Sequence, residues 1–61
     1  MTITLRAARI NKGYTMAVAA ELLGISKDTL SNYERGITYP DVPILRKIEE
    51  VYGIKYTDLF F

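Results

Sequence analysis

Hydrophobic residues recur along the chain at spacings of three and four, and glycines separate the segments in which they do so. These spacings place side chains on one face of a helix. Helices are predicted over residues 4–12, 16–23, 27–34 and 42–52, and residues 56–60 could add one last turn. No segment alternates apolar and polar residues for long enough to predict a strand. The pattern therefore predicts an all-α fold.

Capping residues and glycines support these bounds. Thr15, Ser26 and Asp41 each precede a helical segment, and their side chains can accept a hydrogen bond from a free helix amide. A glycine follows each segment, where a left-handed residue can end a helix. The core candidates, in helix order, are Leu5, Ala8 and Ile10; Leu22 and Leu23; Leu30 and Tyr33; and Val42, Leu45, Ile48 and Tyr52. We expect residues 1–61 to form a single domain around this one core.

Composition removes several classes of function. The chain has no cysteine and no histidine, which excludes disulfides, a Cys/His zinc site and the nucleophilic mechanisms that depend on either residue. Carboxylates and lysines show no recognisable catalytic spacing, so we expect no enzyme, no cofactor and no metal. No apolar run approaches the roughly 18 residues that a membrane span needs, and the start of the chain lacks the basic residues of a signal peptide. We expect a cytoplasmic protein with no membrane partner and no small-molecule ligand.

The net charge of +1 says little about partners until it is divided along the chain. Residues 1–36 carry five basic and three acidic residues, whereas residues 37–61 carry three basic and four acidic residues. The resulting local charges of +2 and −1 are a modest bias, which permits non-specific affinity for DNA without requiring it.

Residues 15–36 hold the most informative pattern, two short predicted helices joined by Leu23-Gly24-Ile25-Ser26. A turn this tight sets helices at about 90–120°, the geometry of a helix-turn-helix. Ala20 is small where the helices would cross, and Ile25 can fill the junction. The spacing alone leaves open an ordinary corner of two helices that binds nothing.

Further motifs lie in register along nearly the whole chain, from Leu5 to Phe60. They are Leu5-x-x-x-Arg9, Lys12-Gly13-x-Thr15, Ala20-Glu21-Leu22-Leu23-Gly24-Ile25-Ser26, Leu30-Ser31-x-Tyr33-Glu34-Arg35-Gly36, Pro40, Leu45-x-Lys47-Ile48, Gly53-Ile54 and Asp58-Leu59-Phe60. In these motifs the chain resembles the Cro and phage-repressor (Xre-like) type of helix-turn-helix family. The resemblance implies a compact five-helix, lambda-repressor-like domain whose third helix enters the DNA major groove. It also implies a sequence-specific transcriptional regulator, of the kind of a small phage or prophage repressor.

Four residues of the third predicted helix are candidate base readers: Lys27, Asp28, Thr29 and Asn32. Lysine can donate to guanine, asparagine can pair with adenine, and aspartate can accept from the cytosine amine; Thr29 could touch a thymine methyl or a phosphate. In the resembled family, the positions of Lys27, Asp28 and Asn32 are the usual base readers. Alternatives stay open, because Asp28 could only complement the helix dipole, Lys27 could reach only a phosphate, and Asn32 could be solvated surface.

Basic and polar residues flanking this helix are candidate phosphate contacts: Lys12, Thr15, Ser31, Arg35, Thr38 and Tyr39. The chain has Met16 where the resembled family commonly has a glutamine that contacts a phosphate, so that side-chain contact is in doubt while backbone donors remain. The resemblance further implies a structural ion pair between Arg9 and Glu34, which would join the first helix to the end of the third. The alternative for Arg9 is a phosphate contact.

The end of the chain is rich in large apolar side chains: Ile54, Tyr56, Leu59, Phe60 and Phe61. We expect them to form a homodimer interface, because apolar patches mark association sites and two-fold dimers bind symmetric operators. The alternative is a monomer whose tail folds back onto the core. A rival function, favoured by Met16 and Asp28, is a protein-interaction module such as an antitoxin or adaptor with weak or no DNA binding.

Overall fold

The computed structural model describes residues 2–60, which form four α-helices, one turn of 3-10 helix and two short strands. The α-helices are α1 (Leu5–Asn11), α2 (Met16–Leu23), α3 (Lys27–Glu34) and α4 (Val42–Tyr52). The 3-10 turn η1 spans Tyr56–Asp58, and the strands are β1 (Ile3–Thr4) and β2 (Leu59–Phe60). The all-α prediction is therefore confirmed in its main elements, while the expected fifth helix is only the single turn η1.

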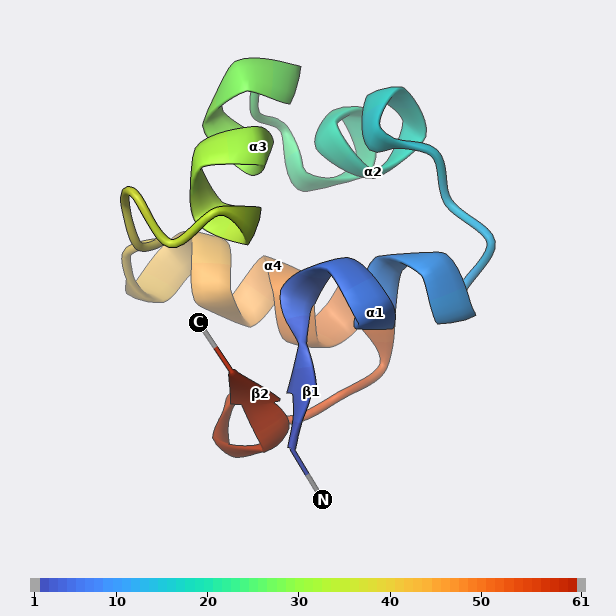
Figure 1. Cartoon of the computed structure of the whole chain (residues 1–61), viewed down its shortest axis with the longest axis vertical. Coiled ribbons are helices and arrows are strands. Elements are labelled where there is room, and N and C mark those ends of the chain that lie inside the picture. Colours follow the sequence, from blue (N-terminus) through green and yellow to red (C-terminus); the bar gives the residue numbers. More distant parts are fainter. Residues whose placement is uncertain (1, 61) are drawn as a thin grey trace.

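The helices enclose one small core. α2 contacts both α3 and α4, and α1 contacts α3. Figure 1 shows α2 and α3 at the top of the molecule, α1 and α4 below them, and the two strands at the bottom. Each α-helix contributes one large, fully buried side chain to the core, namely Leu5, Leu23, Leu30 and Ile48. The α2–α3 pair is thus held from below by the other two helices.

The predicted caps are confirmed. The side-chain oxygens of Thr15, Ser26 and Asp41 each accept a hydrogen bond at 3.1 Å from the amide three residues further along. Gly24 ends α2 and Gly53 ends α4, with φ of 73° and 66°. Such left-handed backbone is strained for residues with a β-carbon. Local chemistry therefore sets the bounds of the helices that carry the turn.

Three core predictions are wrong, because each residue lies off the stripe that its helix buries. Ile10 is 53% exposed, Leu22 45% and Val42 63%. α1 buries Leu5, Ala8 and Arg9; α2 buries Ala19, Ala20 and Leu23; α4 buries Ile48 and Tyr52. Adjacent positions on a helix point about 100° apart. Leu22 therefore points away from Leu23 on the side opposite Ala20, outside the buried stripe of α2.

The two ends of the chain meet in a parallel pair of strands, where Ile3 lies opposite Leu59 and Thr4 opposite Phe60. The expectation of no strand is wrong at these positions, because two residues are too few to show an alternating pattern. η1 lacks a capping side chain at Lys55. Instead Glu49 of α4 accepts a hydrogen bond from the Tyr56 amide at 2.8 Å. No helix within residues 2–60 is long and apolar enough to cross a membrane.

Candidate nucleic-acid interface

The turn between α2 and α3 is closed by backbone hydrogen bonds. The Gly24 amide donates to the Glu21 carbonyl at 3.1 Å, and the Ile25 amide donates to the Ala20 carbonyl at 3.0 Å. Ala20 is buried and Ile25 is partly buried against the core, as the sequence predicted for a close crossing. The turn is therefore a tight helix-turn-helix junction, with α3 packed on α2.

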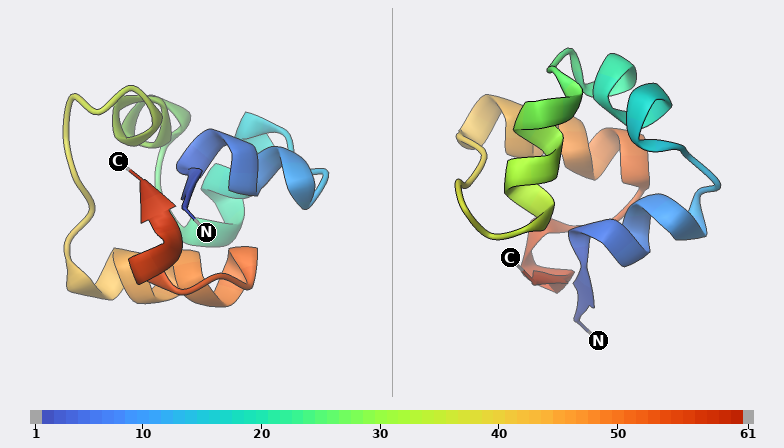
Figure 2. Two further views of the ribbon diagram at one scale, coloured as in Figure 1. Left: turned by 60° about the horizontal axis from the view of Figure 1, so that its bottom comes forward. Right: turned by 45° about the horizontal axis from the view of Figure 1, so that its top comes forward.

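α3 is divided between a buried face and an open one. Leu30 is fully buried and Tyr33 is nearly so, whereas Lys27 and Asp28 are exposed and Asn32 is half-buried. In the right-hand view of Figure 2, α3 faces the viewer with no other element crossing it. The open face therefore presents a cation, an anion and an amide side by side.

Thr29 belongs to the cap of α3 more than to its open face. Its hydroxyl lies 2.8 Å from the Ser26 hydroxyl, and its amide donates to the same oxygen at 3.1 Å. The Thr29 hydroxyl is thus engaged locally, which leaves its methyl group for an apolar contact.

The candidate phosphate residues are not all on one side of the molecule. Arg35, Thr38 and Tyr39 are exposed at the end of α3 and in the following loop, Ser31 is half-buried on α3, and Thr15 caps α2. Lys12 is directed elsewhere: a β-carbon added to Gly53 would lie 3.2 Å from its Nζ. The Lys12 ammonium therefore lies at the C-terminal end of α4, where the helix dipole favours a cation.

The surface of α2 departs from a polar phosphate-binding face. Met16 is partly buried against the core, so its side chain serves packing, whereas Val18 is 44% exposed. Together with Leu22 at 45%, Val18 places two apolar side chains four residues apart on the outside of α2. Any phosphate contact at the start of α2 must come from Thr15 and backbone amides.

Arg9 and Glu34 form the ion pair that the resemblance implies. Arg9 Nε lies 2.8 Å from Glu34 Oε2, and Nη2 donates to Oε1 at 3.4 Å. Their side chains are only 11% and 5% exposed, so water screens the pair weakly. The remaining terminal nitrogen of Arg9, Nη1, donates to the backbone carbonyl of Tyr14 at 3.0 Å. One guanidinium thus bonds the end of α3 and the loop that leads into α2.

Two tyrosines, Tyr14 and Tyr52, complete this cluster, which was not predicted from the sequence. The rings of Tyr14 and Tyr52 lie 6.3 Å apart between centroids, tilted by 39°. Burial, followed by the negative charge of Glu34, raises the pKa of Tyr52 to about 12, partly offset by the positive charge of Arg9. Among residues 2–60, the Tyr52 hydroxyl is a buried side-chain group with no hydrogen-bond partner. The Tyr14 carbonyl is a main-chain atom, so no residue type could have marked its role.

The predicted dimer residues do not form one exposed patch. Tyr56 and Phe60 are 54% and 64% exposed, but Leu59 is 7% exposed in the core and Ile54 is partly buried against it. Leu59 therefore belongs to the core and not to an exposed surface, because β2 turns its side chain inward. Phe61 lies outside the described residues.

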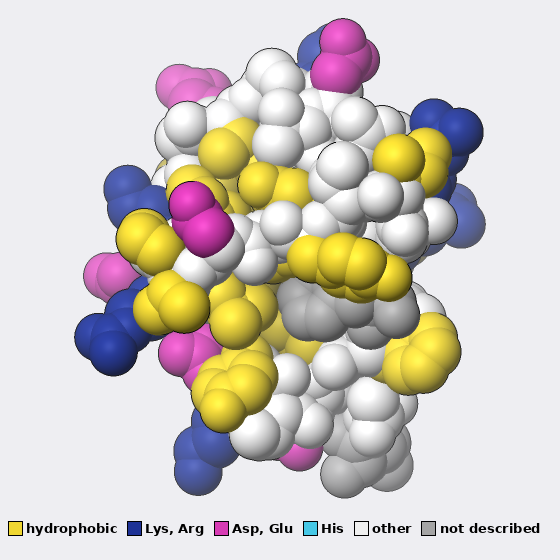
Figure 3. Space-filling view, turned by 90° about the vertical axis from the view of Figure 1, so that its left-hand side faces the viewer, with side chains coloured by type: hydrophobic (Ala, Val, Ile, Leu, Met, Phe, Trp, Pro, Cys, Tyr) yellow, Lys and Arg dark blue, Asp and Glu magenta, His cyan; other side chains and the backbone are white. Residues whose placement is uncertain are grey.

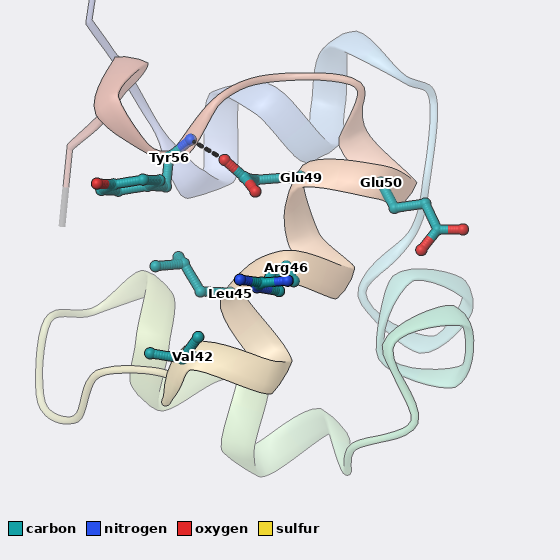
Figure 4. A pocket seen from close by; sticks show the side chains of 6 residues that line it. All are labelled: Val42, Leu45, Arg46, Glu49, Glu50 and Tyr56. Carbon is teal, nitrogen blue, oxygen red and sulfur yellow. Dashed lines mark hydrogen bonds between the residues drawn. The ribbon is translucent and has the colours of Figure 1, made fainter.

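An apolar groove lies instead along α4. We call it the α4 groove, and its lining residues are Val42, Leu45, Arg46, Glu49, Glu50 and Tyr56. Figure 4 shows Tyr56 and Val42 at its two ends, with Leu45 and Arg46 between them. Exposed Ile37 and Tyr39 of the preceding loop add to the apolar surface nearby, and Figure 3 shows hydrophobic side chains gathered on this side with charged groups around them.

Comparison with known proteins agrees with this geometry. Residues 5–59 match the family model described as helix-turn-helix. Over 50 residues, 82% of this chain, it is 44% identical to the HTH-type transcriptional regulator ImmR of Bacillus subtilis (strain 168), of which this covers 39%. Over 57 residues, 92% of this chain, it is 39% identical to the HTH-type transcriptional regulator SlrR of the same organism, of which this covers 38%.

A third relative, from the same organism, is the SPbeta prophage-derived uncharacterized HTH-type transcriptional regulator YonR. The identity is 34% over 50 residues, which cover 82% of this chain and 46% of that protein. The chain therefore spans less than half the length of each of these curated relatives. No solved structure matches the chain.

Proposed function

We propose that this chain, which belongs to the helix-turn-helix family, binds a specific sequence of double-stranded DNA and acts as a transcriptional regulator. The observation that carries the proposal is the division of α3, whose Leu30 and Tyr33 are buried in the core while Lys27 and Asp28 are exposed and Asn32 is half-buried. The three relatives are named as transcriptional regulators, and one as prophage-derived. On that ground we infer a small phage- or prophage-type repressor, which would act by occupying its operator.

The base-reading part of the proposal rests on α3. Lys27 can donate to guanine O6 and N7, Asn32 can pair with adenine N6 and N7, and Asp28 can accept from cytosine N4. All three belong to the helix that the turn fixes on α2. Thr29 contributes its methyl group, because its hydroxyl is engaged with Ser26.

Phosphate contacts would lie on both sides of α3, the helix proposed to read the bases. The first amides of α2 have no partner within their helix and can donate to a phosphate oxygen beside Thr15. At the other end, Arg35, Thr38 and Tyr39 are exposed, and Ser31 lies on α3 between the two. Lys12 drops out of this set, since its ammonium lies at the end of α4.

Selection from a random duplex library at roughly 50 mM salt tests the proposal, since phosphate contacts bind more tightly at low salt. For the selected site, Asn32→Ala should cost about 1–3 kcal/mol and relax preference at one base pair. Arg35→Ala should weaken all duplexes alike and reduce the salt slope by about 1. Lys55→Ala removes the same charge beside η1 and serves as the matched control, with no change expected.

Failure to enrich any sequence would overturn DNA reading and favour the interaction module. The exposed Val18 and Leu22 on α2 would then be the surface to examine.

We also propose that the protein binds DNA as a homodimer through the α4 groove. A two-fold interface uses the same patch on both copies and must be self-complementary. The groove meets this condition, because Arg46 lies beside Glu49 and Glu50 between apolar Val42 and Tyr56. Each copy can thus offer a cation to the carboxylates of the other, beside the apolar side chains of the groove. Such a dimer would address two half-sites about 34 Å apart.

Sedimentation with and without the selected duplex tests the dimer. Val42→Glu places a charge at one end of the groove, and at the first position of α4 it suits the helix dipole. It should leave the protein monomeric. Ile10→Glu alters an exposed apolar residue on α1 and is the matched control, expected to behave as wild type. A wild-type protein that stays monomeric at micromolar concentration, even with DNA, would refute the dimer.

A further inference from the structure

Arg9 forms one hydrogen bond more than its ion pair with Glu34 requires. The guanidinium uses Nε and Nη2 for the carboxylate of Glu34 and Nη1 for the carbonyl of Tyr14. Glu34 is the last residue of α3, and Tyr14 directly precedes Thr15, the cap of α2. The two bonded groups therefore stand at the outer ends of the helix-turn-helix, the ends that the tight turn does not hold.

The turn fixes only one junction of the pair, where Gly24 and Ile25 connect α2 to α3. The start of α2 follows directly from the loop of residues 12–15, and the conformation of this loop decides where the Thr15 cap lies. Backbone hydrogen bonds tie this loop to α1, where the Gly13 amide donates to the Ile10 carbonyl at 2.9 Å and the Tyr14 amide to the Arg9 carbonyl at 3.2 Å. Two side-chain contacts also hold it: the Arg9 hydrogen bond to the Tyr14 carbonyl and the Tyr14 ring against Tyr52 of α4. Arg9 is 9% exposed, so its bonds are formed away from competing water.

We propose that Arg9 is a positioning residue that sets the distance between the start of α2 and the reading face of α3. This inference rests on the proposed function, because that distance decides whether a phosphate beside Thr15 and the bases beneath α3 can be contacted together. A planar guanidinium can bond both groups at once, whereas the lysine ammonium is a compact charge on a flexible stem. The charge alone is thus not sufficient for the role.

Arg9→Lys, which keeps the charge and loses the fork, is the test variant. The wild-type and variant proteins are titrated against operator duplexes in which single phosphates are replaced by neutral methylphosphonates. In the wild type, substitution near the start of α2 and near Arg35 should each lower affinity several-fold. In Arg9→Lys, the penalty near the start of α2 should shrink to about twofold or less, while the penalty near Arg35 is retained.

Ile48→Val is the matched control, since it trims a fully buried side chain of α4 without touching Arg9 or Tyr14. It should lower stability and leave the methylphosphonate profile unchanged. A profile for Arg9→Lys identical to wild type would overturn the proposal. An equal loss of the same penalty in Ile48→Val would also overturn it, because the effect would then be one of general stability.

Hydrogen exchange in the free protein separates this inference from the proposed DNA binding. Val18 and Thr29 amides are matched probes, because each is bonded to its N-cap hydroxyl at 3.1 Å. Arg9→Lys should raise exchange at Val18 at least tenfold more than at Thr29. Tyr14→Ala, which removes the second support of the loop, should do the same and serves where Arg9→Lys does not fold. Equal acceleration at both amides would refute the positioning role even if DNA is bound, and unequal acceleration would support it even if DNA is not.

Discussion

Tyr52 offers the sharpest test of the polar cluster beneath the helix-turn-helix. It is 3% exposed, and its buried hydroxyl has no partner among the described residues. Leaving such a group unpaired costs about 1–3 kcal/mol. Tyr52→Phe removes the hydroxyl and keeps the ring that packs on Tyr14. We therefore expect this variant to be more stable than wild type by about 1 kcal/mol at pH 7.

The same hydroxyl predicts a dependence on pH. Burial and the charge of Glu34 raise the pKa of Tyr52 from 10.0 to about 12. The unfolded chain therefore loses this proton at a lower pH than the folded protein does. The stability contributed by the protonated phenol is complete below pH 10 and is lost as the pH rises through the folded pKa of about 12. A two-unit difference corresponds to about 2.7 kcal/mol of unfolding free energy in full.

Urea unfolding at pH 7, 9, 10 and 11 measures both effects. The advantage of Tyr52→Phe should stay near its neutral value up to pH 9 and grow by about 1.4 kcal/mol at pH 11. Tyr56→Phe, which alters an exposed ring, controls for the loss of a phenol. Parallel losses in wild type and Tyr52→Phe between pH 9 and 11 would refute the pH argument. A Tyr52→Phe protein less stable than wild type at pH 7 would show that the hydroxyl has a partner.

Three further predictions concern stability and are read from thermal or urea unfolding. Gly24→Ala should cost about 1–2 kcal/mol through left-handed strain alone, because no heavy atom beyond Gly24 and its chain neighbours lies within 4 Å of the added carbon; an unchanged melting temperature would contradict this. Leu23→Ala should cost about 2–5 kcal/mol as a buried leucine, while Leu22→Ala should cost less than about 0.5 kcal/mol; equal costs would contradict the assigned faces. Asp41→Ala should cost about 1 kcal/mol by removing the α4 cap, and an Asp41→Asn protein close to wild type would show that the cap bond, and not the charge, matters.

Helix bounds were predictable because they depend on near neighbours. A cap and a terminating glycine act within one turn, so Ser26 and Gly24 could be read directly from the sequence. The inward face of a helix is harder, because it depends on what lies opposite. On α2 the buried residues are Ala19, Ala20 and Leu23. Leu22 was predicted to be buried as well, because it is a large apolar residue next to Leu23.

Contacts between distant parts of the chain could not be predicted from local pattern. The strand pair joins Ile3 to Leu59. The cap of η1 comes from Glu49, which accepts a hydrogen bond from the Tyr56 amide seven residues further along. Resemblance to a family supplied the Arg9–Glu34 pair, but not the third bond of Arg9. That bond ends on a carbonyl, a group that every residue carries.

Few cations remain for the proposed DNA contact once the structure is considered. Arg9 is already bonded to Glu34 and to the Tyr14 carbonyl, and Lys12 lies at the end of α4. The cations that remain on and beside α3 are chiefly Lys27 and Arg35, with Asp28 of opposite sign between them in the sequence. Counterion release grows with the number of phosphates that cations neutralise, so it can supply only a modest share of the affinity here. Amides at the start of α2 and polar groups on α3 must supply the rest, and such directional bonds tolerate little displacement. DNA binding of this kind depends on a fixed arrangement of α2 and α3. The buried Arg9 provides it, because its three donor nitrogens bond Glu34 and the Tyr14 carbonyl.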